Sequence, residues 1–294
     1  MELHLAAAAG NVFGYLWMDE AKDWTGEDYA KILCPRGSGF GLDGLFLMQK
    51  PDGGPWVLEH WDTDGSKSFC SNGSRAALAI PGSPDGPIIE VISSGERILL
   101  RRGEDEVGIR MPEGSGFGLR EVPLPTELPA GFGWIGNPQL VLRVPSVAAV
   151  DLPAFAPPLR HHAALAGGTN VSVIEVLGAG EARIRSWERG VEGETLCCGT
   201  GCAVAAAWLA QTEGIRTWRL HTAGGEVVKV ELTLDQGVNG VGCGSPAGSV
   251  GWVWCIPILP SCCGCKADHG ALGRGTQPAR LACSTPKGMP RCTG

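Results

Sequence analysis

The sequence lacks an apolar segment long enough to cross a membrane. The longest candidate, residues 250–260, is shorter than the roughly 20 residues that a spanning helix needs, and it contains proline. Residues 1–10 include Glu2 and no basic segment, so we expect no secretory signal peptide. We therefore expect a cytoplasmic protein with reduced thiols and no membrane partner.

Positive charge is also scarce. Lys and Arg number 24 against 31 Asp and Glu, which gives a formal net charge of -7 at pH 7. Nucleic acids and anionic membrane surfaces bind basic protein faces, so we expect neither as a partner. With 294 residues, of which 44% are hydrophobic, the chain is long enough for one large domain or two of ordinary size.

Long helical patterns are few, because the 45 Gly and 21 Pro residues together exceed a fifth of the chain. Short apolar segments between turns dominate, and they predict strands. These segments are residues 44–49, 56–60, 88–92, 98–102, 139–144, 171–177, 182–187 and 227–232. Helices are expected at residues 72–80 and 200–211, with a third candidate at residues 159–165.

Two cysteine-led segments, C-S-N-G-S-R-A-A from Cys70 and C-G-T-G-C-A-V-A from Cys198, lie 128 residues apart. Each follows a strand and a charged, glycine-containing loop, and each precedes a predicted helix, a strand, a turn and another strand. The turn glycines Gly95 and Gly224 lie 25 and 26 residues after their cysteines. We infer an α+β fold of two pseudo-symmetric domains, each a curved sheet around a central helix, with the site between them.

Both cysteines are expected at the beginning of a helix, where exposed N–H groups and the macrodipole favour an anion. Such a position lowers the pKa of a thiol and lets the thiolate act as a base. Two facing thiols can take a proton from one face of a carbon and return one to the other face. A single cysteine at a helix start is more often a small core residue, but two at matched positions favour catalysis. We expect the flanking Cys197 and Cys202 to be packing residues.

The segments around these cysteines resemble the diaminopimelate epimerase family of cofactor-independent racemases. W-E-R-G-V-E-G-E-T-L-C-C-G-T-G at residues 187–201 is similar to the family's W-E-R-G-x-G-E-T-L-A-C-G-T-G, with one additional residue that we assign to Glu192. C-S-N-G-S-R at residues 70–75 resembles C-G-N-G-x-R. Four further segments resemble family motifs and occur in the family's order. They are G-N-V-F (10–13), G-F-G-L-D-G (39–44), G-N-P-Q (136–139) and G-T-N-V (168–171).

The resemblance implies an isomerase that acts on a small amino acid without a cofactor or a metal. Cys70 and Cys198 would be the acid/base pair. The residues that hold the substrate's amino and carboxylate groups would be Asn11, Asn137, Asn170, Glu188 and Arg189. Backbone N–H groups at Asn72-Gly73 and Gly199-Thr200 would hold the reacting carboxylate. The sequence does not determine the oligomeric state, and the assembly that we expect is a homodimer.

Two residues depart from the family's pattern. Gln139 replaces a histidine that the resemblance places near the first thiol, so we expect activation of Cys70 to depend on its helix end. Asp62 replaces an asparagine at the distal end of the substrate, and its carboxylate favours a distal ammonium. These changes leave open a racemase of another amino acid. A dehydratase on the same scaffold is a further alternative, although such relatives often lack one thiol.

The repeat predicts an N-terminal domain over residues 1–125, a C-terminal domain over residues 126–234 and an atypical tail over residues 235–294. From residue 236 onward the only acidic residue is Asp268, and Gly and Pro are frequent. The tail's seven cysteines are Cys243, Cys255, Cys262, Cys263, Cys265, Cys283 and Cys292. We expect this tail to be disordered, and a shifted reading frame in the source gene would also explain the change in composition. Zinc binding at Cys262, Cys263, Cys265 and His269 is a third alternative, but the spacing matches no strong zinc pattern.

Overall fold

The computed structural model describes residues 2–19, 24–103, 106–110, 118–120, 123, 125–165, 167–233, 249–255, 259–260 and 265–266. The described residues belong to two compact units. Unit 1 contains those within Met1–Glu96 together with residues 259–260 and 265–266, and unit 2 contains those within Arg97–Pro257. The domain boundaries at residues 125 and 234 stay predictions.

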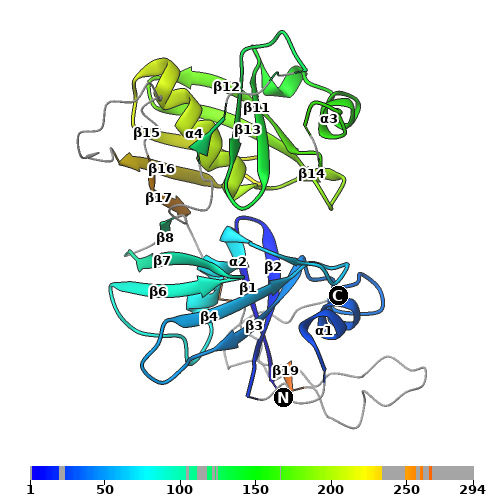
Figure 1. Cartoon of the computed structure of the whole chain (residues 1–294), viewed down its shortest axis with the longest axis vertical. Helices are drawn as coiled ribbons and strands as arrows, with labels where there is room; N and C mark the ends of the chain where they lie inside the picture. The colour runs from blue at the N-terminus through cyan, green and yellow to red at the C-terminus, as the bar shows by residue number, and fades with distance from the viewer. Residues whose placement is uncertain are drawn as a thin grey trace. The chain divides into compact units, whose positions relative to one another are not determined.

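Unit 1 is a curled sheet with short helices (Figure 1). Its strands include β1 (Glu2–Ala8), β2 (Asn11–Trp17), β3 (Gly44–Gln49), β4 (Trp56–Trp61), β5 (Lys67–Ser68) and β6 (Ile88–Ser93). The β1–β2 and β3–β4 pairs are antiparallel and the β2–β3 pair is parallel, while β4 also pairs antiparallel with β5 and parallel with β6. Helix α2 (Ser71–Ala76) is buried throughout and packs against β1 and β2, and the 3-10 turn η1 (Ala77–Ala79) follows it.

Helix α1 (Gly26–Leu33) is a feature of unit 1 that the sequence analysis missed. Its N-terminus has a capping box: the Asp28 N–H donates to the Thr25 hydroxyl, and the Thr25 N–H donates to the Asp28 carboxylate. Tyr29, Ala30 and Leu33 are buried in the core that α1 forms with β3. The T-G-E-D sequence was a usable signal for this helix start.

Unit 2 has a larger curled sheet. Its strands are β7 (Glu96–Arg102), β8 (Val107–Arg110), β9 (Gly118–Leu119), β10 (Ala130–Trp134), β11 (Pro138–Arg143), β12 (Asn170–Gly178), β13 (Glu181–Glu188), β14 (Gly193–Thr195), β15 (Thr217–His221), β16 (Val227–Thr233) and β17 (Ser249–Cys255). Helix α4 (Gly199–Glu213) packs against β10, β11, β12, β15 and β16 (Figure 1). The 3-10 turn η2 (Val147–Ala149) precedes helix α3 (Leu152–Arg160), which packs against β12, β13 and β14.

The helix expected at residues 159–165 is wrong in position, because α3 ends at Arg160. Proline occupies its first turn, where the missing N–H costs nothing. Pro157 and Pro158 lie inside α3, but Leu152, Ala156 and Leu159 form one buried apolar face. Burial of that face offsets the hydrogen bonds that the inner prolines remove.

The two units repeat one order of elements. β1, β2, β3, β4, β5, α2 and β6 in unit 1 correspond to β10, β11, β12, β13, β14, α4 and β15 in unit 2. The pairings also match: β10–β11, β12–β13 and β13–β14 are antiparallel, and β11–β12 and β13–β15 are parallel. This agreement confirms the pseudo-symmetric α+β fold. In the second hairpin the glycine with a left-handed backbone is Gly225 (φ 84°), one residue later than the spacing predicted.

The tail contributes strands to both units. β17 pairs antiparallel with β16 and β8 in unit 2. The short strands β18 (Leu259–Pro260) and β19 (Cys265–Lys266) pair antiparallel with β1 in unit 1. The proposed zinc ligands Cys262, Cys263 and His269, and most residues of the disorder and frameshift hypotheses, lie outside the described residues.

Among the described residues, no group of three or more His, Cys, Asp and Glu side chains is placed to hold a metal ion. Within the same part of the chain, every helix is too short or too polar to cross a membrane.

Candidate active site

Cys70 is the N-cap residue of α2, as the sequence predicted. Its backbone is extended (φ -127°, ψ 109°), and its carbonyl accepts hydrogen bonds from the Ser74 N–H at 3.0 Å and the Ser74 hydroxyl at 2.8 Å. The Cys70 residue is half-buried, whereas all six residues of α2 are buried. The thiol therefore lies where a rigid, buried helix meets a more accessible loop.

Hydrogen bonds connect two of the predicted site residues in unit 1, Asn11 and Asn72, and add Arg75. Asn72 Nδ2 donates to Asn11 Oδ1 at 3.0 Å, and Arg75 Nη2 donates to Asn72 Oδ1 at 2.5 Å. On the next residue of α2, the Gly73 carbonyl accepts from the buried Tyr15 hydroxyl at 2.8 Å. The structure thus brings Asn11, Asn72 and Gly73 together beside Cys70, and it adds Arg75.

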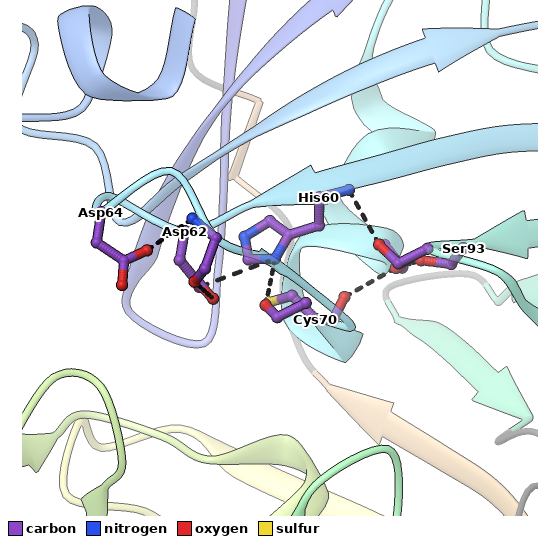
Figure 2. A network of polar contacts seen from close by, with 9 residues as sticks. His60, Asp62, Asp64, Cys70 and Ser93 are labelled. Atoms are coloured by element: carbon purple, nitrogen blue, oxygen red, sulfur yellow. Dashed lines mark hydrogen bonds and ion pairs between the residues drawn. The ribbon is translucent and has the colours of Figure 1, made fainter. Parts of the chain in front are cut away.

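A buried histidine near Cys70 was not found by the sequence analysis. His60 Nδ1 lies 2.9 Å from Ser68 Oγ and 3.9 Å from Asp62 Oδ1, and Figure 2 shows this network with Cys70 beside it. Burial lowers the pKa of His60, against the smaller raising effect of Asp62. His60 Nε2 has no hydrogen-bond partner and packs against Gly44, where a Cβ would lie 2.3 Å away. A neutral ring with its proton on Nδ1 fits these contacts, because an unpaired acceptor costs less than an unpaired cation.

Asp62 lies in the turn after β4, next to His60. Its Oδ2 accepts from the Ser66 hydroxyl at 3.4 Å, and its side chain is 42% exposed. Its carboxylate therefore keeps access to solvent in the unit that also holds Cys70 and Asn11.

Cys198 is the N-cap residue of α4. Its sulfur accepts from the Gly201 N–H at 3.4 Å and lies 3.5 Å from the Thr200 hydroxyl oxygen. Cys198 is 4% exposed, and Cys197 and Cys202 are buried around it, as expected for packing residues. The Cys198 thiol is therefore held from two sides by α4 in a site from which water is largely excluded.

The expectation of a lowered thiol pKa is wrong for Cys198. Burial raises the pKa of this thiol well above its ordinary value, and the Glu188 carboxylate and Cys197 raise it further. The hydrogen bonds from Thr200 and Gly201 lower the pKa but do not compensate. Desolvation thus outweighs the helix end, and Cys198 rests as the neutral thiol near pH 7.

Gln139 contacts Cys198, which corrects its assignment to the neighbourhood of Cys70. This fully buried amide donates from Nε2 to Asn137 Oδ1 at 2.7 Å and to Thr200 Oγ1 at 2.9 Å, and the same nitrogen lies 3.8 Å from Cys198 Sγ. A linear motif does not tell which thiol a strand residue faces. The signal available in the sequence was a single amide in the apolar strand P-Q-L-V-L.

The remaining predicted residues of unit 2 lie at the beginning of β12 and at the end of β13. Asn170 is the β12 neighbour of Gln139, and its Oδ1 accepts from the Arg189 N–H at 2.7 Å. Glu188 Oε1 accepts from the Thr195 hydroxyl at 2.5 Å and is close enough to raise the pKa of Cys198. The Arg189 guanidinium donates to the Gly167 carbonyl at 3.2 Å. Glu188 is half-buried and Arg189 is exposed, so a substrate role for the two side chains stays a prediction.

The additional residue of the W-E-R-G segment is anchored to α3. Glu192 has a left-handed backbone (φ 50°), which is unfavourable for a residue other than glycine. Its Oε1 accepts from Arg160 at 3.1 Å (Nε) and 2.7 Å (Nη2) and from the Gly190 N–H at 3.1 Å. His161 Nε2 lies 3.5 Å from Glu192 Oε2. The inserted carboxylate therefore ties the loop that begins at Glu188 to the end of α3.

Comparisons with known proteins identify the family of this chain. The family model for diaminopimelate epimerase matches residues 134–246, which include β11, β12 and α4. A diaminopimelate epimerase from Gemmatimonas aurantiaca is 31% identical over 219 residues, which cover 69% of this chain and 76% of that protein. The chain belongs to the diaminopimelate epimerase family. A second diaminopimelate epimerase, from Moorella thermoacetica, is 31% identical over 223 residues, 67% of this chain and 79% of its own length.

Solved structures support the fold of this epimerase-family chain. A hydroxyproline epimerase from Agrobacterium vitis superposes with a TM-score of 0.61 at 14% identity and covers 88% of this chain and 90% of its own. A phenazine biosynthesis protein of the PhzF family from Bacillus anthracis gives a TM-score of 0.60 at 13% identity, with coverages of 88% and 98%. At such identities these structures show the fold alone. The sequence relatives make this chain an isomerase of the racemase and epimerase class.

We expect the alkylation of Cys198 to show the raised pKa directly. In the folded protein, the rate with iodoacetamide should keep rising about tenfold per pH unit beyond pH ~8.5, the ordinary thiol pKa. In denaturant, the same cysteine should level off near that value. Glu188→Gln should lower the folded pKa, because it removes a carboxylate that disfavours the thiolate. A Cys198 that levels off below pH 8.5 while folded would contradict the assignment.

Proposed function

We propose that this member of the diaminopimelate epimerase family interconverts LL- and meso-diaminopimelate, with Cys70 and Cys198 as the two bases. The observation that carries the proposal is the matched placement of the thiols as N-cap residues of α2 and α4 in two repeated units. Each thiol has its own carboxamide neighbours: Asn11 and Asn72 in unit 1, and Asn137 and Asn170 in unit 2. The product would serve lysine and peptidoglycan precursor synthesis, and the reaction would occur in the cytoplasm, where thiols stay reduced.

The proposed chemistry needs only groups that this chain supplies. One thiolate takes the α-proton, and the other thiol donates its proton to the opposite face of the same carbon. The thiolate and the thiol have then exchanged roles, so the next turnover runs in the reverse direction or follows proton exchange with solvent. Backbone N–H groups at Asn72-Gly73 and Gly199-Thr200 would stabilise the carbanion, whose charge resides on the α-carboxylate.

The choice of substrate depends on the distal group. Diaminopimelate carries an ammonium and a carboxylate at its far end, and the half-buried carboxylate of Asp62 suits the ammonium. The same carboxylate supports a second candidate, a racemase of another amino acid with a cationic distal group. Asp62→Asn would remove that preference without changing the size of the side chain.

A substrate panel in D₂O tests the proposal. LL-diaminopimelate, meso-diaminopimelate, lysine and histidine are incubated separately with reduced, folded protein, and α-deuterium is measured by NMR. We expect deuterium in diaminopimelate and little in the other amino acids. Deuterium only in lysine or histidine would support the second candidate, and deuterium in none of the four would rule out both.

The contact between Glu192 and α3 should contribute to substrate binding. Glu192→Gln removes the ion pair with Arg160, so the loop should become ordered only when substrate binds. This ordering should cost a binding free energy of the size that an exposed ion pair contributes, ~0.2–1 kcal/mol. We expect KM to rise up to about fivefold, with kcat nearly unchanged.

The matched control for this variant is Glu213→Gln, which removes the ion pair between Glu213 and Arg143 (2.6 Å) at the far end of α4. It should leave KM unchanged. Equal KM values for the wild type and Glu192→Gln would show that the loop keeps its conformation without this contact.

A further inference from the structure

Arg75 is a buried guanidinium without a carboxylate partner in the described part of the chain. It is 1% exposed and ranks among the largest fully buried side chains. Nη2 donates to Asn72 Oδ1, whereas Nε and Nη1 have no hydrogen-bond partner.

A buried, uncompensated positive charge is strongly unfavourable. If packing alone were required, Met or Leu would fill the same volume without that cost. A guanidinium in this position is therefore explained best by an anion that forms nearby during the protein's work. The nearest ionisable group in the sequence is Cys70, the N-cap residue of α2, which lies about one and a half turns before Arg75.

The other titratable groups around α2 do not supply this anion. Burial raises the pKa of Tyr15 on β2 well above its ordinary value, and a negative Cys70 raises it further, so Tyr15 stays neutral. His60 is neutral for the reason given above, and Asp62 is half-exposed and contacts Ser66.

Strand β1, which also packs against α2, carries Glu2 and His4 only at half-buried positions near its beginning. Cys70 remains as the group whose ionisation would compensate Arg75.

We propose that Arg75 is the buried counter-charge that keeps Cys70 in its thiolate form, and that it also orients Asn72. This inference rests on the proposed role of Cys70 as a base. The hydrogen bond from Arg75 to Asn72 Oδ1 fixes the Asn72 amide, so that its Nδ2 donates to Asn11. Arg75 is thus a positioning residue that acts on the site through charge and through Asn72.

The two thiols would then differ in protonation state in the enzyme without substrate. Inversion requires one thiolate and one thiol. Cys70, with Arg75 in its helix, would supply the thiolate, and Cys198, buried beside the Glu188 carboxylate, would supply the thiol. Proton abstraction in the resting enzyme would then begin at Cys70.

The test measures the Cys70 titration without any substrate. Alkylation by iodoacetamide is followed from pH 5 to 10 by peptide mass spectrometry in the wild type, Arg75→Met and Arg75→Lys. We expect a wild-type Cys70 pKa below the ordinary ~8.5 and a rise of at least one unit in Arg75→Met, which slows alkylation at pH 7 about tenfold. Arg75→Lys should restore most of the shift, and the Cys198 titration should stay unchanged in both variants.

Two results would overturn the inference. One is a wild-type Cys70 that titrates at or above the ordinary thiol pKa, which requires no variant to fold. The other is an Arg75→Met protein that unfolds cooperatively yet shows the wild-type Cys70 titration. Because alkylation needs no substrate, a shifted Cys70 with no α-deuterium from any amino acid would refute the proposed function and leave the role of Arg75 intact.

Discussion

Cys198→Ala and Cys70→Ala should each abolish inversion of diaminopimelate. Each thiol serves one face of the α-carbon, so either variant lacks the group that takes or returns the proton on its face. Loss of one positioned acid or base costs a factor of about 10²–10⁴. We expect inversion in both variants to fall by at least that factor, as measured by the conversion of LL- to meso-diaminopimelate.

The matched control is Cys202→Ala. Cys202 is one turn after Cys198 in α4 and is fully buried, so this substitution removes a thiol of the same helix that only packs. It should lower stability modestly and retain activity. If Cys198→Ala kept the inversion rate of Cys202→Ala, the role of Cys198 as an acid or base would be refuted.

Gly73→Ala should destabilise unit 1 and impair its site. A Cβ at Gly73 would lie 2.2 and 2.5 Å from two ring atoms of Phe46. The Phe46 ring cannot move aside readily, because it is fully buried and stacked on Tyr15 with ring centroids 5.1 Å apart. Overpacking of this kind costs typically ~1–3 kcal/mol. We expect the free energy of unfolding to fall by about that amount in chemical denaturation.

Activity should fall further than stability in this variant. Displacing α2 also disturbs the hydrogen bond from Tyr15 to the Gly73 carbonyl and the position of Asn72. Gly178→Ala is the control, since no atom lies within 4 Å of a Cβ there and the backbone is ordinary. Equal unfolding free energies for the two variants would show that α2 can shift away from Phe46 at little cost.

The parts of this account that the sequence predicted are those with local signals. The order strand, loop, cysteine, helix and hairpin occurs in residues 56–102 and again in residues 182–232. The structure has that order in both units. N-cap positions for Cys70 and Cys198 followed from the small polar residues after each thiol. Local capping and turn chemistry determines such features, so one segment is enough to recognise them.

The features that the sequence analysis missed depend on contacts between distant segments. Gln139 reaches Cys198 across 59 residues, and Arg75 becomes unusual only because the sheet buries it. The raised pKa of Cys198 has the same origin, since desolvation depends on packing that no motif describes. His60 is hidden for a further reason: its alternation with apolar residues in β4 is that of an ordinary core position.

The most direct test of the two-thiol account is the location of solvent deuterium early in the reaction. Wild-type protein is incubated with LL-diaminopimelate in D₂O, the reaction is stopped after a small fraction of conversion, and the two epimers are separated and analysed by NMR. The account predicts deuterium at the inverted α-carbon of the meso product and none in the recovered LL substrate, because separate thiols remove and return the proton. Deuterium that enters the recovered substrate as fast as the product would show that one base acts on both faces and would contradict the account.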